Sequence, residues 1–178
     1  ATNLDLAGVP AGVRKRGAWV LMDTIGAILA GQAEPELVNF RQAEDSDEAA
    51  LIAAGAAGVA LELDEGELTA MGHPAAHVVP AALLAARREG ASGASLLEAI
   101  IAGYEVSARI GASVRLRPGS HPHGVWGAIG AATAVGRIRG LDEDLLGEAL
   151  SIAATFGLGT TYDAVRDGAT ARNLWAGA

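Results

Sequence analysis

Apolar residues spaced three and four apart constrain the fold of this chain more than any other feature. Between residues 95 and 115 they occur at Leu96, Leu97, Ile100, Ile101, Tyr104, Val106 and Ile110. This spacing places apolar side chains on one face of a helix. No convincing stretch alternates with period two, and only 4% of residues are aromatic against 51% hydrophobic. Because Ala, Leu, Ile and Val therefore dominate, we predict an all-α fold of closely packed helices.

Proline, glycine and short polar residues mark the ends of the predicted helices. We expect helices over 10–31, 47–63, 74–89, 95–115, 124–140 and 143–157, a loop or short helix over 34–48, and a turn plus helix over 165–178. Asp45-Ser46 and Asp142 are expected helix caps. Gly124, Gly127 and Gly130 predict a close approach of two helix backbones. With 178 residues, we expect one helical domain over 1–178.

Charge and cysteine content exclude several classes of protein. The net charge of −8 and a pI near 4.9 argue against a nucleic-acid surface, which needs a basic patch. The absence of cysteine excludes disulfides, thiolate metal ligands and a cysteine nucleophile, and fits a cytoplasmic enzyme. No apolar run reaches the roughly 18 residues that span a membrane. We therefore expect neither a nucleic-acid nor a membrane partner.

One segment between two predicted helices collects acid–base groups. Residues 61–77 contain Glu62, Asp64, Glu65, Glu67, His73 and His77. Such groups in a glycine-containing loop are typical of a catalytic centre. Glu62 and Asp64 lie where the preceding helix should end, and they are the better candidates. We interpret Glu65 and Glu67 as part of a solvated loop.

A second pair of histidines, His121 and His123, suggests a partner for this loop. His73 and His121 each precede a proline, which disfavours the helical conformation. We expect both at loop ends, partly exposed and just before a helix N-terminus, where the dipole favours anions. The four histidines could instead bind a metal. However, Pro74 places His73 at the helix cap, so His73 and His77 need not share a face, and we expect no metal.

Four stretches taken together resemble the MmgE/PrpD family. They are LMDTIGAILAG, LELDEGELTAMGHPAAHVVPAALLAA, GASGASLLEAIIAGYEVSARIG and GSHPHGVWGAIGAATAVGRIRGLD. That family includes 2-methylcitrate dehydratase, cis-aconitate decarboxylase and iminodisuccinate epimerase. The resemblance follows the family's order along nearly the whole chain and is weakest over 33–48. It implies a large all-helical domain, of which this chain is an incomplete piece, and a smaller α+β domain that is absent here.

The resemblance also implies a homodimer without a cofactor, acting on small di- or tricarboxylates. The family's Asp-apolar-Asp-Asp motif falls on residues 62–65, the histidine of its His-Pro motif on His73, and its Gly-aromatic-His on residues 119–121. A family lysine falls on Arg172. Glu62, Ser120 and Arg172 depart from the family pattern. Because arginine stays charged, Arg172 can bind a carboxylate but is a poor acid–base group.

Our leading hypothesis is a lyase that dehydrates or hydrates a small di- or tricarboxylate. A base must remove the proton next to a carboxylate and an acid must protonate the departing hydroxyl. We assign these roles to His73 and His121, with Asp64 or Glu62 tuning one imidazole. The groups expected to hold substrate carboxylates are Arg172, His123 and Arg117. Decarboxylation and epimerisation use related chemistry and stay open, as does a non-catalytic helical binding or dimerisation module.

Overall fold

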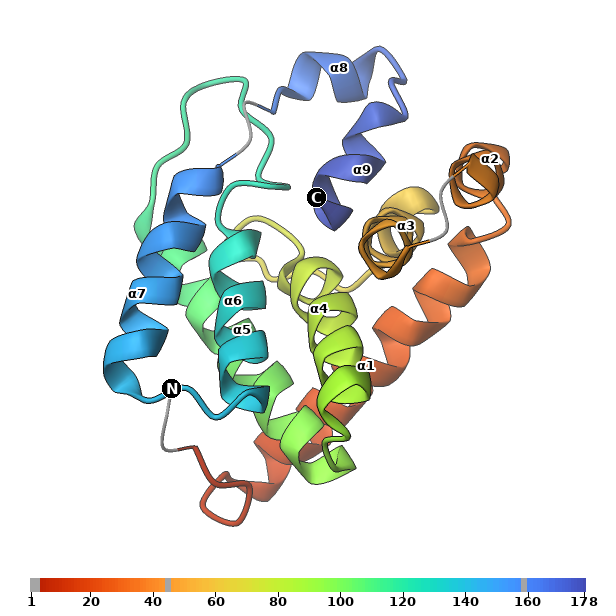
Figure 1. Cartoon of the computed structure of the whole chain (residues 1–178). Helices are drawn as coiled ribbons and strands as arrows, with labels where there is room; N and C mark the ends of the chain where they lie inside the picture. Colours follow the sequence, from red (N-terminus) through yellow and green to blue (C-terminus); the bar gives the residue numbers. More distant parts are fainter. Residues whose placement is uncertain (1–3, 44–45, 158–159) are drawn as a thin grey trace.

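The computed structural model describes residues 4–43, 46–157 and 160–178. Its elements are α1 Ala11–Gly31, α2 Pro35–Ala43, α3 Asp47–Ala60, α4 Pro74–Glu89, α5 Gly93–Ser113, α6 Gly127–Ile138, α7 Glu143–Ala153, the 3₁₀ turn η1 Ala154–Phe156, α8 Tyr162–Arg166 and α9 Ala171–Gly177 (Figure 1). Within these described ranges, extended pairing is limited to one isolated bridge between Glu67 and Gly72. The predicted all-α fold is confirmed.

Short polar side chains cap the N-termini of several helices. Ser46 accepts a hydrogen bond from the Ala49 amide, and Asp142 does the same for Leu145. Both bonds satisfy an amide that has no partner within its own helix. The predicted caps at Ser46 and Asp142 are therefore confirmed, whereas Asp45 lies outside the described residues. Ser92 caps α5 in the same way.

Two predicted helix ends were wrong, and positive φ angles explain both. The helix expected over 47–63 ends at Ala60, because Glu62 adopts a φ of 56°. The helix expected over 124–140 begins only at Gly127, since Gly124 has a φ of 76° and belongs to the preceding loop. Neither angle is compatible with a right-handed helix. These corrections leave longer loops at the places where the candidate residues lie.

Helices α4, α5 and α6 pack against one another around the main core. This core contains Ala75, Val78, Val79, Ala82, Ala99, Ile100 and Ala134. Small residues bring α5 and α6 together: a Cβ on Gly103 would lie 2.6 Å from the Gly130 carbonyl oxygen, and one on Gly130 would lie 2.6 Å from the Ser107 Cβ. The predicted close backbone approach is thus confirmed at Gly130.

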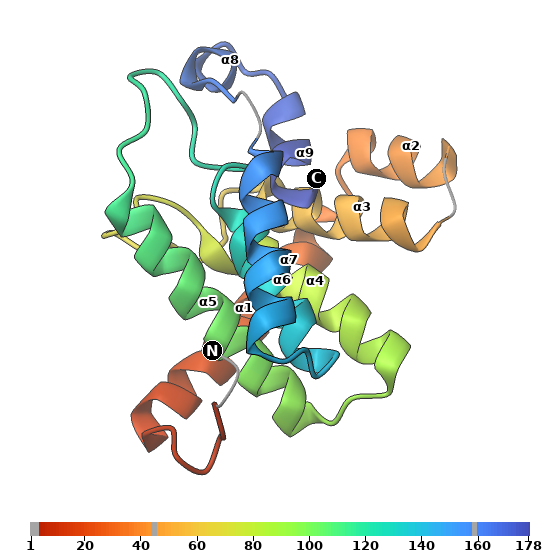
Figure 2. The same ribbon diagram turned by 60° about the vertical axis from the view of Figure 1, so that its left-hand side comes forward.

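The remaining helices surround this core and leave one end of it to the loops. Helix α1 crosses beneath α4 and α5, and α7 covers α6 (Figures 1 and 2). The first turns of α4 and α6 lie at the same end of the molecule, facing α9 (Figure 1). The loops 61–73 and 114–126 both lead into this end. In the part of the chain that the structure describes, no helix is long and apolar enough to cross a membrane.

Candidate active site

His73 sits at the start of α4 beside a carboxylate. It is the N-cap residue, as predicted, and its side chain makes no capping bond. Its Nδ1 lies 2.7 Å from the Glu65 carbonyl oxygen and 2.9 Å from Asp64 Oδ2. The Asp64 bond raises the pKa of His73, against an opposing effect of burial. Because Nδ1 faces two acceptors, it carries the proton, and Nε2 keeps a lone pair that can act as a base.

Glu65 is not the solvated residue that we expected. Its Oε1 accepts from the Ala75 amide at 2.7 Å, and its Oε2 accepts from the Tyr104 hydroxyl at 2.7 Å. Burial raises the pKa of this carboxyl, although both hydrogen bonds oppose the effect. The loop folds back over the first turn of α4, whose free amides favour an anion. The Glu67 carboxylate differs, since the hydrogen bonds found for it lie within its own turn, at Thr69 and Ala70.

His77 is a structural histidine with both ring nitrogens in use. Nδ1 lies 3.1 Å from the His73 carbonyl oxygen, and Nε2 accepts from the Gly124 amide at 3.2 Å. Burial lowers the pKa of His77 to about 4, so the ring is neutral at neutral pH. A Cβ on Gly127 would lie 2.3 Å from this ring. At Gly127 the close neighbour is therefore a side chain and not the predicted second helix backbone, and the glycine makes room for the histidine that joins α4 to the loop before α6.

His121 lies in that loop and not at a helix N-terminus, and only 5% of it is exposed. The expected partly exposed position was wrong because residues 160–175 cover it. The Thr160 hydroxyl donates to the His121 carbonyl oxygen at 2.6 Å, and the rings of Tyr162 and Trp175 pack on the imidazole at centroid distances of 4.8 and 5.8 Å. Its Nδ1 accepts from the His123 amide. The neutral ring therefore carries its proton on Nε2 and can donate it.

His123 is the centre of the histidine cluster. Its ring lies 5.3 Å from that of His73, 5.6 Å from that of His77 and 4.4 Å from that of His121. It is 1% exposed, and among the described residues neither ring nitrogen has a hydrogen-bond partner. Burial lowers its pKa to about 2. Since each unsatisfied buried polar group costs roughly 1–3 kcal/mol, a polar ligand atom that reached His123 would gain affinity.

Three of these side chains have the chemistry of metal ligands. Asp64, His73 and His123 each offer one ligand atom, and these atoms lie within 4.8 Å of one another. Around a tetrahedral zinc ion with bonds near 2.1 Å, neighbouring ligand atoms are about 3.4 Å apart. The set would have to contract to hold such an ion. The expected absence of a metal stays a prediction that chelation can test.

Arg172 and Glu62 pair with each other. Arg172 is 9% exposed; it donates to the Val59 carbonyl oxygen at 3.1 Å and forms an ion pair with Glu62. Asp64, and not Glu62, is thus the carboxylate that contacts His73. Arg172 and Trp175 are three apart on α9, a spacing that places them on the same side of the helix. The guanidinium is therefore one helical turn from the ring that packs on His121.

Arg117 does not join the group. It is exposed in the loop 114–126, and in the described ranges no hydrogen bond or ion pair links its side chain to the other candidates. Sequence reasoning missed Glu65, Tyr104, Tyr162 and Trp175. In the sequence, Tyr104 fits the apolar face of a helix, and only its hydroxyl indicates that it could have a polar role. The spacing of 39 residues between Glu65 and Tyr104 carries no local signal.

Comparisons with known proteins identify the family. The family model described as the MmgE/PrpD N-terminal domain matches residues 44–178. The chain belongs to the MmgE/PrpD family. It is 30% identical over 181 residues to cis-aconitate decarboxylase of Aspergillus terreus, covering 87% of this chain and 37% of the relative. It is 30% identical over 182 residues to the cis-aconitate decarboxylase-like protein oryM of Aspergillus oryzae, covering 86% of this chain and 38% of the relative.

The match agrees with the fold. The matching family model is that of an N-terminal domain, and the described residues are helical, as the resemblance implied. The residues from His73 to Trp175 that form the cluster all lie within the matched range. The chain spans 37% of the length of the Aspergillus terreus relative.

Proposed function

We propose that this chain is the helical domain, over 1–178, of a cofactor-independent lyase that dehydrates or hydrates a small di- or tricarboxylate. The observation that carries the proposal is that one cluster contains both a proton acceptor and a proton donor. His73 presents a lone pair on Nε2, whereas neutral His121 presents a proton on Nε2. Both rings lie against His123. A base and an acid in the same cluster are what an elimination of water requires.

The first step would be proton removal by His73. Nε2 takes the proton from the carbon next to a substrate carboxylate, and the electron pair moves into that carboxylate as an enolate-like species. Asp64 stabilises the imidazolium that forms, because its carboxylate lies 2.9 Å from Nδ1. His73 is also the accessible member of the pair with Asp64, its side chain being 31% exposed against 3% for the aspartate. Substrate can therefore reach the base directly.

The second step would be loss of water. The His121 Nε2 proton passes to the departing hydroxyl, the carbon–oxygen bond breaks, and the electron pair of the enolate-like species forms the new double bond. Arg172 and His123 are the proposed carboxylate-binding groups, and the predicted role of Arg117, which lies outside the cluster, stays a prediction. Arg172 already binds the Glu62 carboxylate, so it is suited to exchange that partner for a substrate carboxylate. Planar guanidinium groups pair with carboxylates through two parallel hydrogen bonds.

Decarboxylation is the second candidate reaction, and the relatives favour it. Both Aspergillus relatives are named as cis-aconitate decarboxylase or its like. In that reaction the carbon–carbon bond to the leaving carboxylate breaks, its electron pair stays on the substrate carbon, and an imidazole supplies a proton to that carbon. It needs one proton donor and no base. The Asp64–His73 pair is the feature that favours elimination of water over loss of CO₂.

A product and exchange profile of the full-length protein distinguishes these outcomes. Citrate-like, aconitate-like and succinate-like acids would be incubated in D₂O, with carbon–carbon double bonds, CO₂ and solvent deuterium measured in parallel. Interconversion of hydroxy acid and alkene supports the dehydratase. Release of CO₂ alone would identify a decarboxylase and not a dehydratase. Deuterium incorporation without loss of water would identify an epimerase. If the acids bind but neither turn over nor exchange, the chain is a binding module.

The proposal includes an assembly and a location. We propose a homodimer, since the family resemblance implies one, in the cytoplasm, with which the lack of cysteine is consistent. Sedimentation of the full-length protein tests the dimer. A cavity of about 250 Å³ lined by His77, Gly124 and Trp175 lies beside the cluster. We assign no substrate to it, because both His77 nitrogens are already bonded.

A further inference from the structure

We propose that Glu65 and Tyr104 are positioning residues that orient the His73 ring so that Nε2 is its reacting nitrogen. This inference rests on the proposed function for its kinetic consequences, but its structural part can be measured independently. Neither residue was predicted from the sequence to take part. Both lie outside the groups assigned to proton transfer or to carboxylate binding.

The Glu65 side chain is fixed at both of its oxygens. Oε1 accepts from the Ala75 amide and Oε2 from the Tyr104 hydroxyl, each at 2.7 Å. Ala75 belongs to the first turn of α4, two residues after His73, and Tyr104 belongs to the middle of α5. The carboxylate therefore ties the loop to two separate helices. Because both carboxylate oxygens are bound, the backbone of Glu65 has little freedom to move.

The backbone of this same residue holds the histidine. The Glu65 carbonyl oxygen lies 2.7 Å from His73 Nδ1, closer than Asp64 Oδ2 at 2.9 Å. Anchoring the side chain therefore fixes the acceptor that selects the Nδ1–H tautomer. If the anchor is lost, the carbonyl can move away and the ring can rotate or change tautomer. Nε2 would then no longer present its lone pair reliably.

The surroundings of the carboxylate fit positioning better than proton transfer. The groups that act on it electrostatically are Asp64, His73 and Tyr104. Burying a carboxylate is costly unless hydrogen bonds compensate, and here both oxygens are compensated by groups from different helices. Burial and the adjacent carboxylate raise the pKa of the Tyr104 hydroxyl, whose proton is already engaged in the bond to Glu65. We therefore infer that Glu65 and Tyr104 act by fixing the position of the His73 ring.

The test uses Tyr104→Phe, Glu65→Gln and Glu65→Ala in the full-length protein. Glu67→Gln is the matched control, since it changes a carboxylate two residues away whose hydrogen bonds are to Thr69 and Ala70 in its own turn. We expect kcat to fall about tenfold in Tyr104→Phe and about 100-fold in Glu65→Ala with KM little changed, because misplacing a catalytic group by about 1 Å costs on this scale. Glu67→Gln should stay within about twofold of wild type.

The independent readout is the ¹⁵N spectrum of the His73 ring, assigned by its loss in His73→Gln. Wild type should show a protonated Nδ1 and an unprotonated Nε2, and Glu65→Ala should show a mixture of tautomers. If wild type is protonated on Nε2, or if Tyr104→Phe and Glu65→Gln leave both tautomer and kcat unchanged, the inference is overturned. These two variants preserve packing should Glu65→Ala not fold. Full activity in His73→Ala with a tautomer change in Glu65→Ala would refute the proposed function only.

Discussion

The two segments that carry histidines differ in how many of their imidazole nitrogens have hydrogen-bond partners in the protein. In the segment 61–77 the ring of His77 bonds through both nitrogens, and Nδ1 of His73 faces two acceptors. In the segment 119–126, the described part of the chain provides a hydrogen bond to Nδ1 of His121 and no partner to either ring nitrogen of His123. Both segments precede a helix at the same end of the molecule, and they touch through the imidazoles.

The segment 61–77 is therefore the preformed half of the site, and the segment 119–126 is the half whose hydrogen bonds a ligand would complete. A ring held by two partners has a fixed orientation and tautomer before substrate arrives, which lowers the cost of reaching the transition state. A ring with unsatisfied buried nitrogens gains when a polar ligand reaches it. We therefore expect the first segment to contribute more to stability and the second, through His123, to contribute more to ligand binding, while each supplies one of the two proton-transfer histidines.

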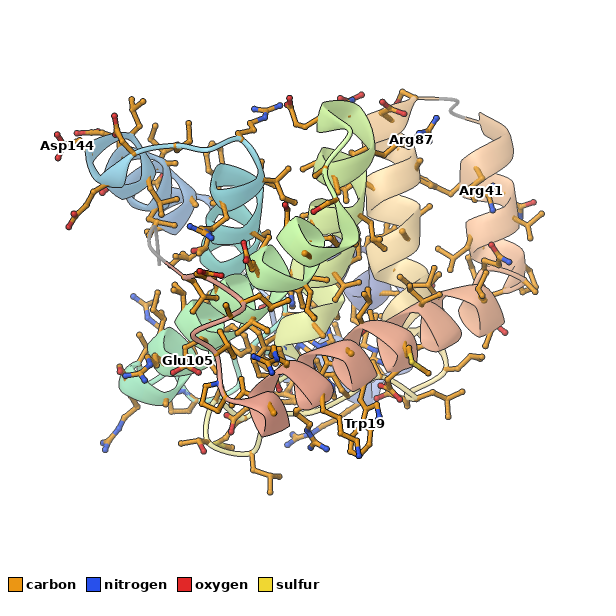
Figure 3. The ribbon with its side chains drawn as sticks, turned by 90° about the horizontal axis from the view of Figure 1, so that it is seen from below. Trp19, Arg41, Arg87, Glu105 and Asp144 are labelled. Atoms are coloured by element: carbon orange, nitrogen blue, oxygen red, sulfur yellow. The ribbon has the colours of Figure 1, made fainter. Side chains whose placement is uncertain are left out.

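The largest expected effect is on turnover in His73→Ala and His121→Ala. Each should lower kcat/KM by roughly 10²–10⁴-fold, the usual contribution of a general acid or base. His73→Ala should remain folded, because the side chain makes no capping bond. Arg87→Ala is the control: Arg87 is in the last turn of α4 and lies at the periphery in Figure 3. An unchanged rate in either histidine variant, measured on the carboxylate panel, would remove that residue from the mechanism.

The next effect tests the comparison through stability. His77→Leu strands the His73 carbonyl and the Gly124 amide, so we expect a loss of roughly 2–5 kcal/mol in the free energy of unfolding. His123→Leu should cost under half as much, because its ring nitrogens have no hydrogen-bond partner within the ranges 4–43, 46–157 and 160–178. Urea denaturation of both variants measures the difference. Equal losses would mean that the two buried histidines do not differ as described.

A smaller effect concerns the pH dependence of Asp64→Asn. The Asp64 carboxylate favours the imidazolium form and so raises the pKa of His73. A base works only when neutral, and kcat/KM should therefore rise with pH through the pKa of His73. Removing the carboxylate lowers this pKa, and the rise should move to lower pH. A shift to higher pH, or none, in the pH–rate profile would contradict the pairing of Asp64 with the catalytic base.

The smallest expected effect is that of metal removal. Asp64, His73 and His123 offer three potential ligand atoms, but the proposed reaction uses His73 as the base, with Asp64 stabilising its imidazolium form, and needs no metal. We expect activity to survive prolonged dialysis against EDTA within experimental error. The metal content of the dialysed protein should be measured in the same sample. If activity is lost on dialysis and returns when a divalent cation is added, the cluster is a metal centre and the expectation is wrong.

Much of the helical framework could be predicted from the sequence because helix formation is local. The three- and four-residue spacing in α5, the cap at Asp142 and the proline at the start of α4 all act within a few residues. The two errors at helix ends came from residues with positive φ, Glu62 and Gly124. Glutamate rarely adopts this conformation, so the pattern at Glu62 predicted one more turn of helix.

The sequence by itself determined which residue types were available: four histidines in two pairs, each pair with one member before a proline, and a group of carboxylates beside the first. Only the tertiary structure decided their roles. It paired Asp64 with His73 and Glu62 with Arg172, made His77 structural, and brought Tyr104 to Glu65 across 39 positions. The physical reason is that hydrogen bonds and burial depend on distances between helices, which the spacing of residues along one helix does not contain.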